Sequence, residues 1–159
     1  MSKTLVAYFS AGGNTAAAAK AIADTIAADL YEIQPAVPYT DDDLNWHDKE
    51  SRSSREMNDP SFRPPLADTD AKIADYDTVL LGFPIWWYIA PTIIRTFLEA
   101  YDFSGKRIIL FATSGGSRFG KAAEFLRQSA PDAEITEGKI FTHRADPENL
   151  KEWTDSLGL

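Results

Sequence analysis

Short apolar runs alternate along the chain with segments whose apolar residues recur every three or four positions. The strongest runs occupy residues 4–9, 78–83 and 107–113. They lack polar alternation and so predict parallel strands covered on both faces, with 78–83 expected at the centre of the sheet. Weaker runs predict a strand at 30–37, nearer an edge, and a last strand within 133–142, interrupted around Gly138.

The segments between these runs have the periodicity of amphipathic helices. Helices are predicted over residues 16–29, from Pro91 to Tyr101, from near Ser117 to before Pro131, and from Asp146 to Gly158. Pro91 and Pro147 suit the first turn of a helix. Strands that alternate with helices predict an α/β fold, a doubly wound parallel sheet with helices on both faces and right-handed crossovers.

Residues 38–70, called the excursion below, fit this alternation least. They are polar and are interrupted by prolines. We expect one or two short helices in a long excursion over the sheet, and we favour a structural cover over a functional loop.

Length and composition place the chain among soluble globular proteins. Its 159 residues, 44% hydrophobic and 25% charged, predict one domain with a sizeable core. Apolar runs stay well short of the roughly 20 residues that cross a bilayer. The amino terminus lacks the pattern of a secretory signal, so a cytoplasmic location is expected.

The absence of cysteine and the scarcity of histidine narrow the possible chemistry. With no cysteine, the chain has no disulfide, thiol nucleophile or cysteine-ligated cluster. His47 and His143 alone do not suggest a metal site. Redox chemistry would therefore have to come from a bound cofactor.

The formal net charge of −8 argues against partners that are themselves anionic. Nucleic acid and anionic membranes both require a cationic footprint, so neither is expected as a partner. An acidic surface could steer the chain toward a basic protein, or could simply keep it soluble.

The turn after the first strand carries the first candidate site. It contains Ser10, Ala11, Gly12, Gly13, Asn14 and Thr15. The amino end of the helix that follows offers free N–H groups and positive dipole charge, and the glycines allow close approach, so we predict a phosphate site. Hydroxyl residues and Asn are also ordinary helix caps, and only the loop's position at a strand end favours the ligand.

Two further strand ends carry unusual loops that should lie on the same sheet edge. The second loop contains Pro84, Ile85, Trp86, Trp87 and Tyr88, and the third contains Thr113, Ser114, Gly115, Gly116 and Ser117. The aromatic residues suit stacking on a flat ligand, although they could also pack under a neighbouring loop. The glycines could expose amides to a ring edge, or only shape a turn. A ligand with a phosphate at one end and a polar ring at the other, such as FMN, fits all three loops.

Through these three loops nearly the whole chain resembles the flavodoxin family. The resemblance implies five strands in the order 2-1-3-4-5 and FMN at the sheet edge, with the phosphate at residues 10–15, the ring flanked by 84–88 and its pyrimidine edge at 113–117. Trp87 or Tyr88 is then the expected stacking residue. Gly12 stands where the family often has a hydroxyl, and 84–88 contains no glycine, which argues against strong stabilisation of one-electron-reduced flavin.

We therefore expect an FMN protein that carries electrons at low potential, with no catalytic residue of its own and a redox protein as partner. An alternative is a reductase that passes hydride from NAD(P)H to a quinone. In that case Ser51 to Arg55 could approach a nucleotide phosphate, although a solvated helix face is favoured. A flavin-free interaction module is a third possibility, and the choice between monomer and homodimer stays open.

Overall fold

Five parallel strands form the centre of the computed structural model, which describes residues 3–10, 13–45, 47–59, 61–86, 89–114, 118–141 and 147–159. The strands are β1 (Thr4–Tyr8), β2 (Asp29–Glu32), β3 (Thr78–Pro84), β4 (Arg107–Thr113) and β5 (Glu134–Phe141). Their order is β2-β1-β3-β4-β5 and every neighbouring pair is parallel. The predicted fold class and strand order are confirmed, with β3 at the centre.

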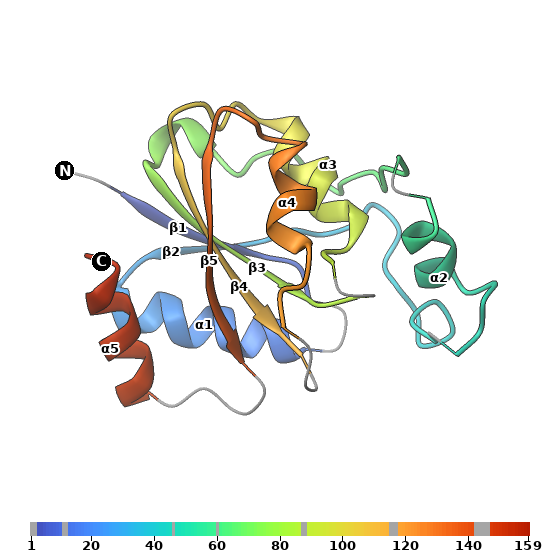
Figure 1. The fold of residues 1–159 in the computed structure, drawn as a ribbon, viewed down its shortest axis with the longest axis horizontal. Coiled ribbons are helices and arrows are strands. Elements are labelled where there is room, and N and C mark those ends of the chain that lie inside the picture. Colours follow the sequence, from blue (N-terminus) through green and yellow to red (C-terminus); the bar gives the residue numbers. More distant parts are fainter. Residues whose placement is uncertain are drawn as a thin grey trace.

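Helices cover both faces of this sheet (Figure 1). Helices α1 (Asn14–Ile26) and α5 (Pro147–Ser156) lie on one face, and α3 (Thr92–Ala100) and α4 (Ala122–Arg127) lie on the other. Along β1, Leu5 and Ala7 pack in the core beneath α3 and α4, whereas Val6 and Tyr8 pack beneath α1 and α5. This double burial explains why β1 reads as a continuous apolar run.

Three predicted boundaries are wrong, and backbone conformation explains two of them. Helix α1 ends at Ile26 because Ala27 adopts the left-handed conformation, with φ 54°. Helix α4 begins at Ala122 and not near Ser117, since Gly120 has φ 57° and a helix cannot continue through that conformation. Strand β2 ends at Glu32, well short of Val37.

The interruption predicted around Gly138 is a β-bulge inside a continuous strand. The register between β4 and β5 shifts at Leu110 and Phe111, opposite Gly138. A Cβ at Gly138 would lie 2.4 Å from the carbonyl oxygen of Leu110 and 2.8 Å from the Trp153 ring. Only glycine therefore allows β5 to approach β4 this closely.

The excursion lies beside the carboxyl end of β1 and not over the sheet (Figure 1). Its helix is α2 (Arg52–Met57), and the short 3₁₀ helix η1 (Ile73–Asp75) follows it. The departing and returning chains run together, since the Ala36 N–H donates to the Pro65 carbonyl at 2.8 Å. Arg63 anchors the excursion to α3 through an ion pair with Glu99, at 3.0 Å.

Among the described residues, the helices are all too short or too polar to cross a lipid bilayer.

Candidate functional site

The ends of β1, β3 and β4 meet at one edge of the sheet, as the three candidate loops require. Tyr8 pairs in register with Gly82, and Pro84 pairs with Thr113. The pairing continues past the strands, because the Phe9 N–H donates to the Gly82 carbonyl at 3.0 Å and the Ile85 N–H donates to the Thr113 carbonyl at 3.0 Å. The three loops therefore start side by side.

The amino end of α1 is open and lacks a side-chain cap among the described residues. Its N-cap is Gly13, at φ 93°, and a Cβ placed there would meet none of the described residues within 4 Å. The Ser10 Oγ accepts from the Gly13 N–H at 3.0 Å, so Ser10 holds the turn and does not cap the helix. Asn14 is exposed. Ala11 and Gly12, also predicted here, lie outside the described residues.

A hydrogen bond joins the first candidate loop to the third. The hydroxyl oxygens of Thr15 and Thr113 lie 2.7 Å apart, and either can be the donor. Thr15 is only 2% exposed, whereas Thr113 is half-buried. The sequence pattern places these threonines at opposite ends of the predicted site and carries no signal for the contact.

Trp86 in the second loop packs against neighbouring aromatic rings. Its ring meets Phe9 edge-on at 5.9 Å between centroids and meets Tyr39 edge-on at 5.7 Å. Reciprocal backbone hydrogen bonds of 3.0 Å join Trp86 to Ile89. Trp86 therefore packs against neighbouring segments, and its place beside a ligand ring stays a prediction. Trp87 and Tyr88 lie outside the described residues.

In the third loop, the Ser114 N–H donates to the Phe141 carbonyl at 3.2 Å and so continues the pairing of β4 with β5. The remaining predicted residues of this loop, Gly115, Gly116 and Ser117, lie outside the described residues. The observed part of the loop thus starts at the sheet edge beside Thr113.

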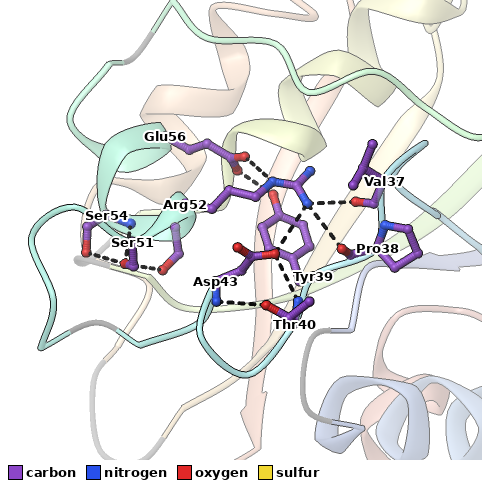
Figure 2. A network of polar contacts seen from close by, with 10 residues as sticks. Val37, Pro38, Tyr39, Thr40, Asp43, Ser51, Arg52, Ser54 and Glu56 are labelled. Atoms are coloured by element: carbon purple, nitrogen blue, oxygen red, sulfur yellow. Dashed lines mark hydrogen bonds and ion pairs between the residues drawn. The ribbon is translucent and has the colours of Figure 1, made fainter.

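A polar cluster in the excursion lies against this edge and was missed by sequence analysis (Figure 2). The Arg52 guanidinium covers the Tyr39 ring, 3.9 Å from its centroid, and its Nε donates to Glu56 at 2.9 Å. The Tyr39 hydroxyl also donates to Glu56. Burial and Glu56 both raise the pKa of Tyr39, so the phenol stays protonated. A lone aromatic residue between Pro38 and Thr40 was the only sequence signal.

The segment from Ser51 to Arg55 is not the solvated helix face that was favoured. Ser51, Ser53 and Ser54 are each at most 5% exposed. The Ser51 Oγ accepts from the Ser54 N–H at 3.3 Å and caps α2. With Arg52 engaged by Glu56, only Arg55 points to solvent among these residues.

Two observations describe the charge near the first loop. Residues 10–15 include no Lys or Arg. Burial, followed by the negative charge of Glu32, raises the pKa of the nearby Tyr8. The described part of the chain has no cluster of acidic and imidazole side chains able to hold a metal ion.

Comparisons with known proteins agree with this architecture. A family model described as flavodoxin matches residues 3–157. A candidate flavoprotein from Bacteroides eggerthii DSM 20697 is 46% identical, with a TM-score of 0.93 and coverage of 100% of this chain and 99% of that one. Another from Bacteroides uniformis ATCC 8492 is 49% identical, with a TM-score of 0.91 and coverage of 97% and 98%.

A more distant structure shares the fold alone. The flavoprotein from Lactobacillus acidophilus NCFM, solved in complex with FMN, is 20% identical, with a TM-score of 0.74 and coverage of 97% of this chain and 99% of that one. No curated protein matches the chain.

Proposed function

This chain belongs to the flavodoxin family, and from that premise we propose that it binds FMN at the carboxyl edge of its sheet and carries electrons at low potential. Bound FMN supplies the electron transfer itself, while the protein binds it and tunes its potential. The observation that carries the proposal is the open amino end of α1, which the 2.7 Å Thr15–Thr113 hydrogen bond joins to the end of β4.

The residues at the α1 end suit a phosphate. The first amides of α1 have no intrahelical partner, and among the described residues no side chain caps them. Among the described residues, nothing lies within 4 Å of where a Cβ of Gly13 would stand. Ser10 holds the turn, and Thr15 brings a hydroxyl to the first turn of the helix. These groups can orient and bind a phosphate through dipoles alone.

The second and third loops suit a flat ring. Ile85 and Trp86 continue from β3 at the sheet edge, and Trp86 is held by packing, which leaves Trp87 or Tyr88 as the proposed stacking residue. Residues 113–117 would face the pyrimidine edge. FMN accounts for both ends of the site with a single ligand.

The low midpoint potential proposed for the flavin rests on the lack of positive charge in the first loop. Residues 10–15 offer no cation, so the charge of a bound phosphate would be balanced only by dipoles. Further negative charge placed nearby on reduction would be repelled, more strongly where water is excluded. The electron-rich faces of indole or phenol rings act in the same direction.

The buried state of α2 favours an electron carrier over an NAD(P)H-dependent reductase. Ser51, Ser53 and Ser54 are buried, and the Arg52 guanidinium is engaged by Glu56 and by the Val37 carbonyl. These residues are therefore not available to a nucleotide phosphate, which leaves only Arg55 of the segment that could approach one in a reductase. A redox protein is the proposed partner.

The visible spectrum of the purified protein tests the proposal. We expect flavin absorbance, or its recovery on titration of the apoprotein with FMN, and a midpoint potential below that of free FMN. Without oxygen, NADPH alone should leave the flavin oxidised, whereas NADPH with a partner reductase should reduce it. A protein that FMN cannot reconstitute would contradict the proposal, and rapid bleaching by NADPH alone would favour the reductase.

A further inference from the structure

Aromatic rings from three separate segments contact one another beside the proposed flavin site. Phe9 immediately precedes Ser10, Trp86 lies in the second loop and Tyr39 comes from the excursion. Phe9 and Tyr39 meet edge-on at 5.6 Å, and each also meets Trp86 edge-on, at 5.9 and 5.7 Å respectively. Tyr39, whose ring belongs to neither of the first two loops, therefore packs on both Phe9 and Trp86 where those loops begin.

Tyr39 itself is held in place by α2 (Figure 2). The Arg52 guanidinium lies 3.9 Å from the centroid of its ring, and its hydroxyl donates to the Glu56 carboxylate. Glu56 is 4% exposed and accepts from the Arg52 Nε at 2.9 Å. One ion pair thus fixes both the face and the hydroxyl of the tyrosine.

Arg52 also binds the backbone that leads to Tyr39. Its second nitrogen, Nη1, donates to the Val37 carbonyl at 2.7 Å and to the Pro38 carbonyl at 3.4 Å. Only a guanidinium can reach Glu56, two carbonyls and an aromatic face at once, because its donors are arranged in a planar fork. A lysine would lose most of these contacts.

The excursion is also attached to the rest of the protein by contacts that involve neither Arg52 nor Tyr39. Arg63 pairs with Glu99 of α3 at 3.0 Å, and Pro35 bridges Leu66 where the chain departs and returns. Neither contact involves Phe9 or Trp86. The Arg52–Tyr39 contact differs from both, because the Tyr39 ring packs on Phe9 and Trp86 beside the proposed flavin site.

We propose that Tyr39 and Arg52 are positioning residues for FMN: by packing Tyr39 on Trp86 and Phe9, they hold the second loop against the first in the arrangement that binds the ring. The inference rests on the proposed function and assigns part of the excursion to the same site. It predicts that a change at Arg52 alters flavin binding although Arg52 need not touch the ligand.

The test is titration of the full-length apoprotein with FMN, combined with visible circular dichroism of the bound flavin and thermal unfolding. Tyr39→Leu removes two ring contacts and should raise the Kd for FMN roughly tenfold, with a changed dichroic spectrum. Arg52→Lys, which keeps the charge and all three rings, should move both readouts in the same direction. Tyr39→Phe keeps the ring and should bind FMN nearly as the wild type does.

Arg63→Met is the matched control, since it breaks the other anchor of the excursion. It should lower the Tm while the Kd and the flavin spectrum stay unchanged. If Tyr39→Leu and Arg52→Lys behave like Arg63→Met, the positioning role is wrong although FMN binding stands. A wild-type protein that binds no FMN overturns the proposed function and this inference together.

Discussion

The hydroxyl of Thr15, in the first turn of α1, lies 2.7 Å from the hydroxyl of Thr113 at the end of β4. The contact joins the amino end of α1, where the phosphate is proposed to bind, to the end of β4, where the third loop begins. Because Thr15 is 2% exposed, its hydroxyl depends on Thr113 or on a ligand for a hydrogen bond.

Removal of either hydroxyl should weaken both the fold and the site. Thr15→Val and Thr113→Val should each lower the free energy of unfolding by about 1 kcal/mol, since each breaks one hydrogen bond. Thr15→Val should also weaken FMN binding, because it removes a proposed donor. Urea unfolding of both single variants and the double variant measures the coupling. Strictly additive losses would show that the two hydroxyls do not interact.

Gly13→Ala should combine a stability loss with a loss of FMN affinity. The φ of 93° at Gly13 strains any residue with a Cβ, at about 1–2 kcal/mol. Gly105, at φ 74° and also with open space around it, is the matched control far from the site in sequence. Gly105→Ala should lose comparable stability in urea and keep the wild-type Kd. Equal Kd values for the two variants would contradict a phosphate site at Gly13.

The aromatic residues of the second loop should separate into two groups. Trp87→Ala and Tyr88→Ala should each weaken FMN binding, with at least one losing about 1–3 kcal/mol, the usual value of a stacked aromatic side chain. Trp86→Ala should lower the Tm and also weaken FMN binding, because Trp86 packs on Phe9 and Tyr39 and so holds the second loop in place. Fluorescence titration gives the Kd of each variant. Wild-type affinity in both Trp87→Ala and Tyr88→Ala would refute the stacking assignment.

A cation placed in the first loop should raise the flavin potential. Asn14 is exposed at the start of α1, so Asn14→Lys adds a positive charge without disturbing the core. Screened attraction for negative charge on the reduced flavin should raise the midpoint potential by an amount on the order of tens of millivolts. Asn14→Gln is the neutral control. An unchanged potential in Asn14→Lys would contradict the charge argument for low potential.

The contribution of Glu99 to stability should disappear in acid. Burial by itself would raise the pKa of Glu99, but hydrogen bonds from Arg63 and Ser129 outweigh it and hold the pKa below its usual 4.5. A carboxyl whose pKa is lowered by folding stabilises the protein fully above its usual pKa, and the benefit is lost as the pH falls through the lowered value. The side chain is 40% exposed, so the effect should stay below about 1 kcal/mol.

Comparison of wild type with Glu99→Gln checks this prediction. The difference in the free energy of unfolding should be largest near pH 7 and should shrink as the pH falls below 4.5. A difference that is constant from pH 7 to pH 3 would show that the carboxylate charge does not contribute.

The local sequence pattern was enough to predict most of the fold. It did not predict the contacts between segments that lie far apart in the chain. The continuous apolar run at 78–83 predicted the central strand because burial on both faces leaves no polar position. Left-handed backbone at Ala27 ended α1 early, and nothing in an alanine indicates that conformation. The excursion was misplaced because its polar composition hides Tyr39, which packs on Phe9 and Trp86 at the sheet edge, and Glu56, which binds Tyr39.

The sequence by itself determined that three ligand-type loops follow strands whose carboxyl ends share one edge, because parallel topology brings such ends together. It also determined that the first loop has no cation. Only the tertiary structure decided that Thr15 forms a hydrogen bond with Thr113. It also decided that Arg52 packs on Tyr39, which in turn packs on Trp86. Those contacts depend on how segments far apart in the chain pack, which no local periodicity encodes.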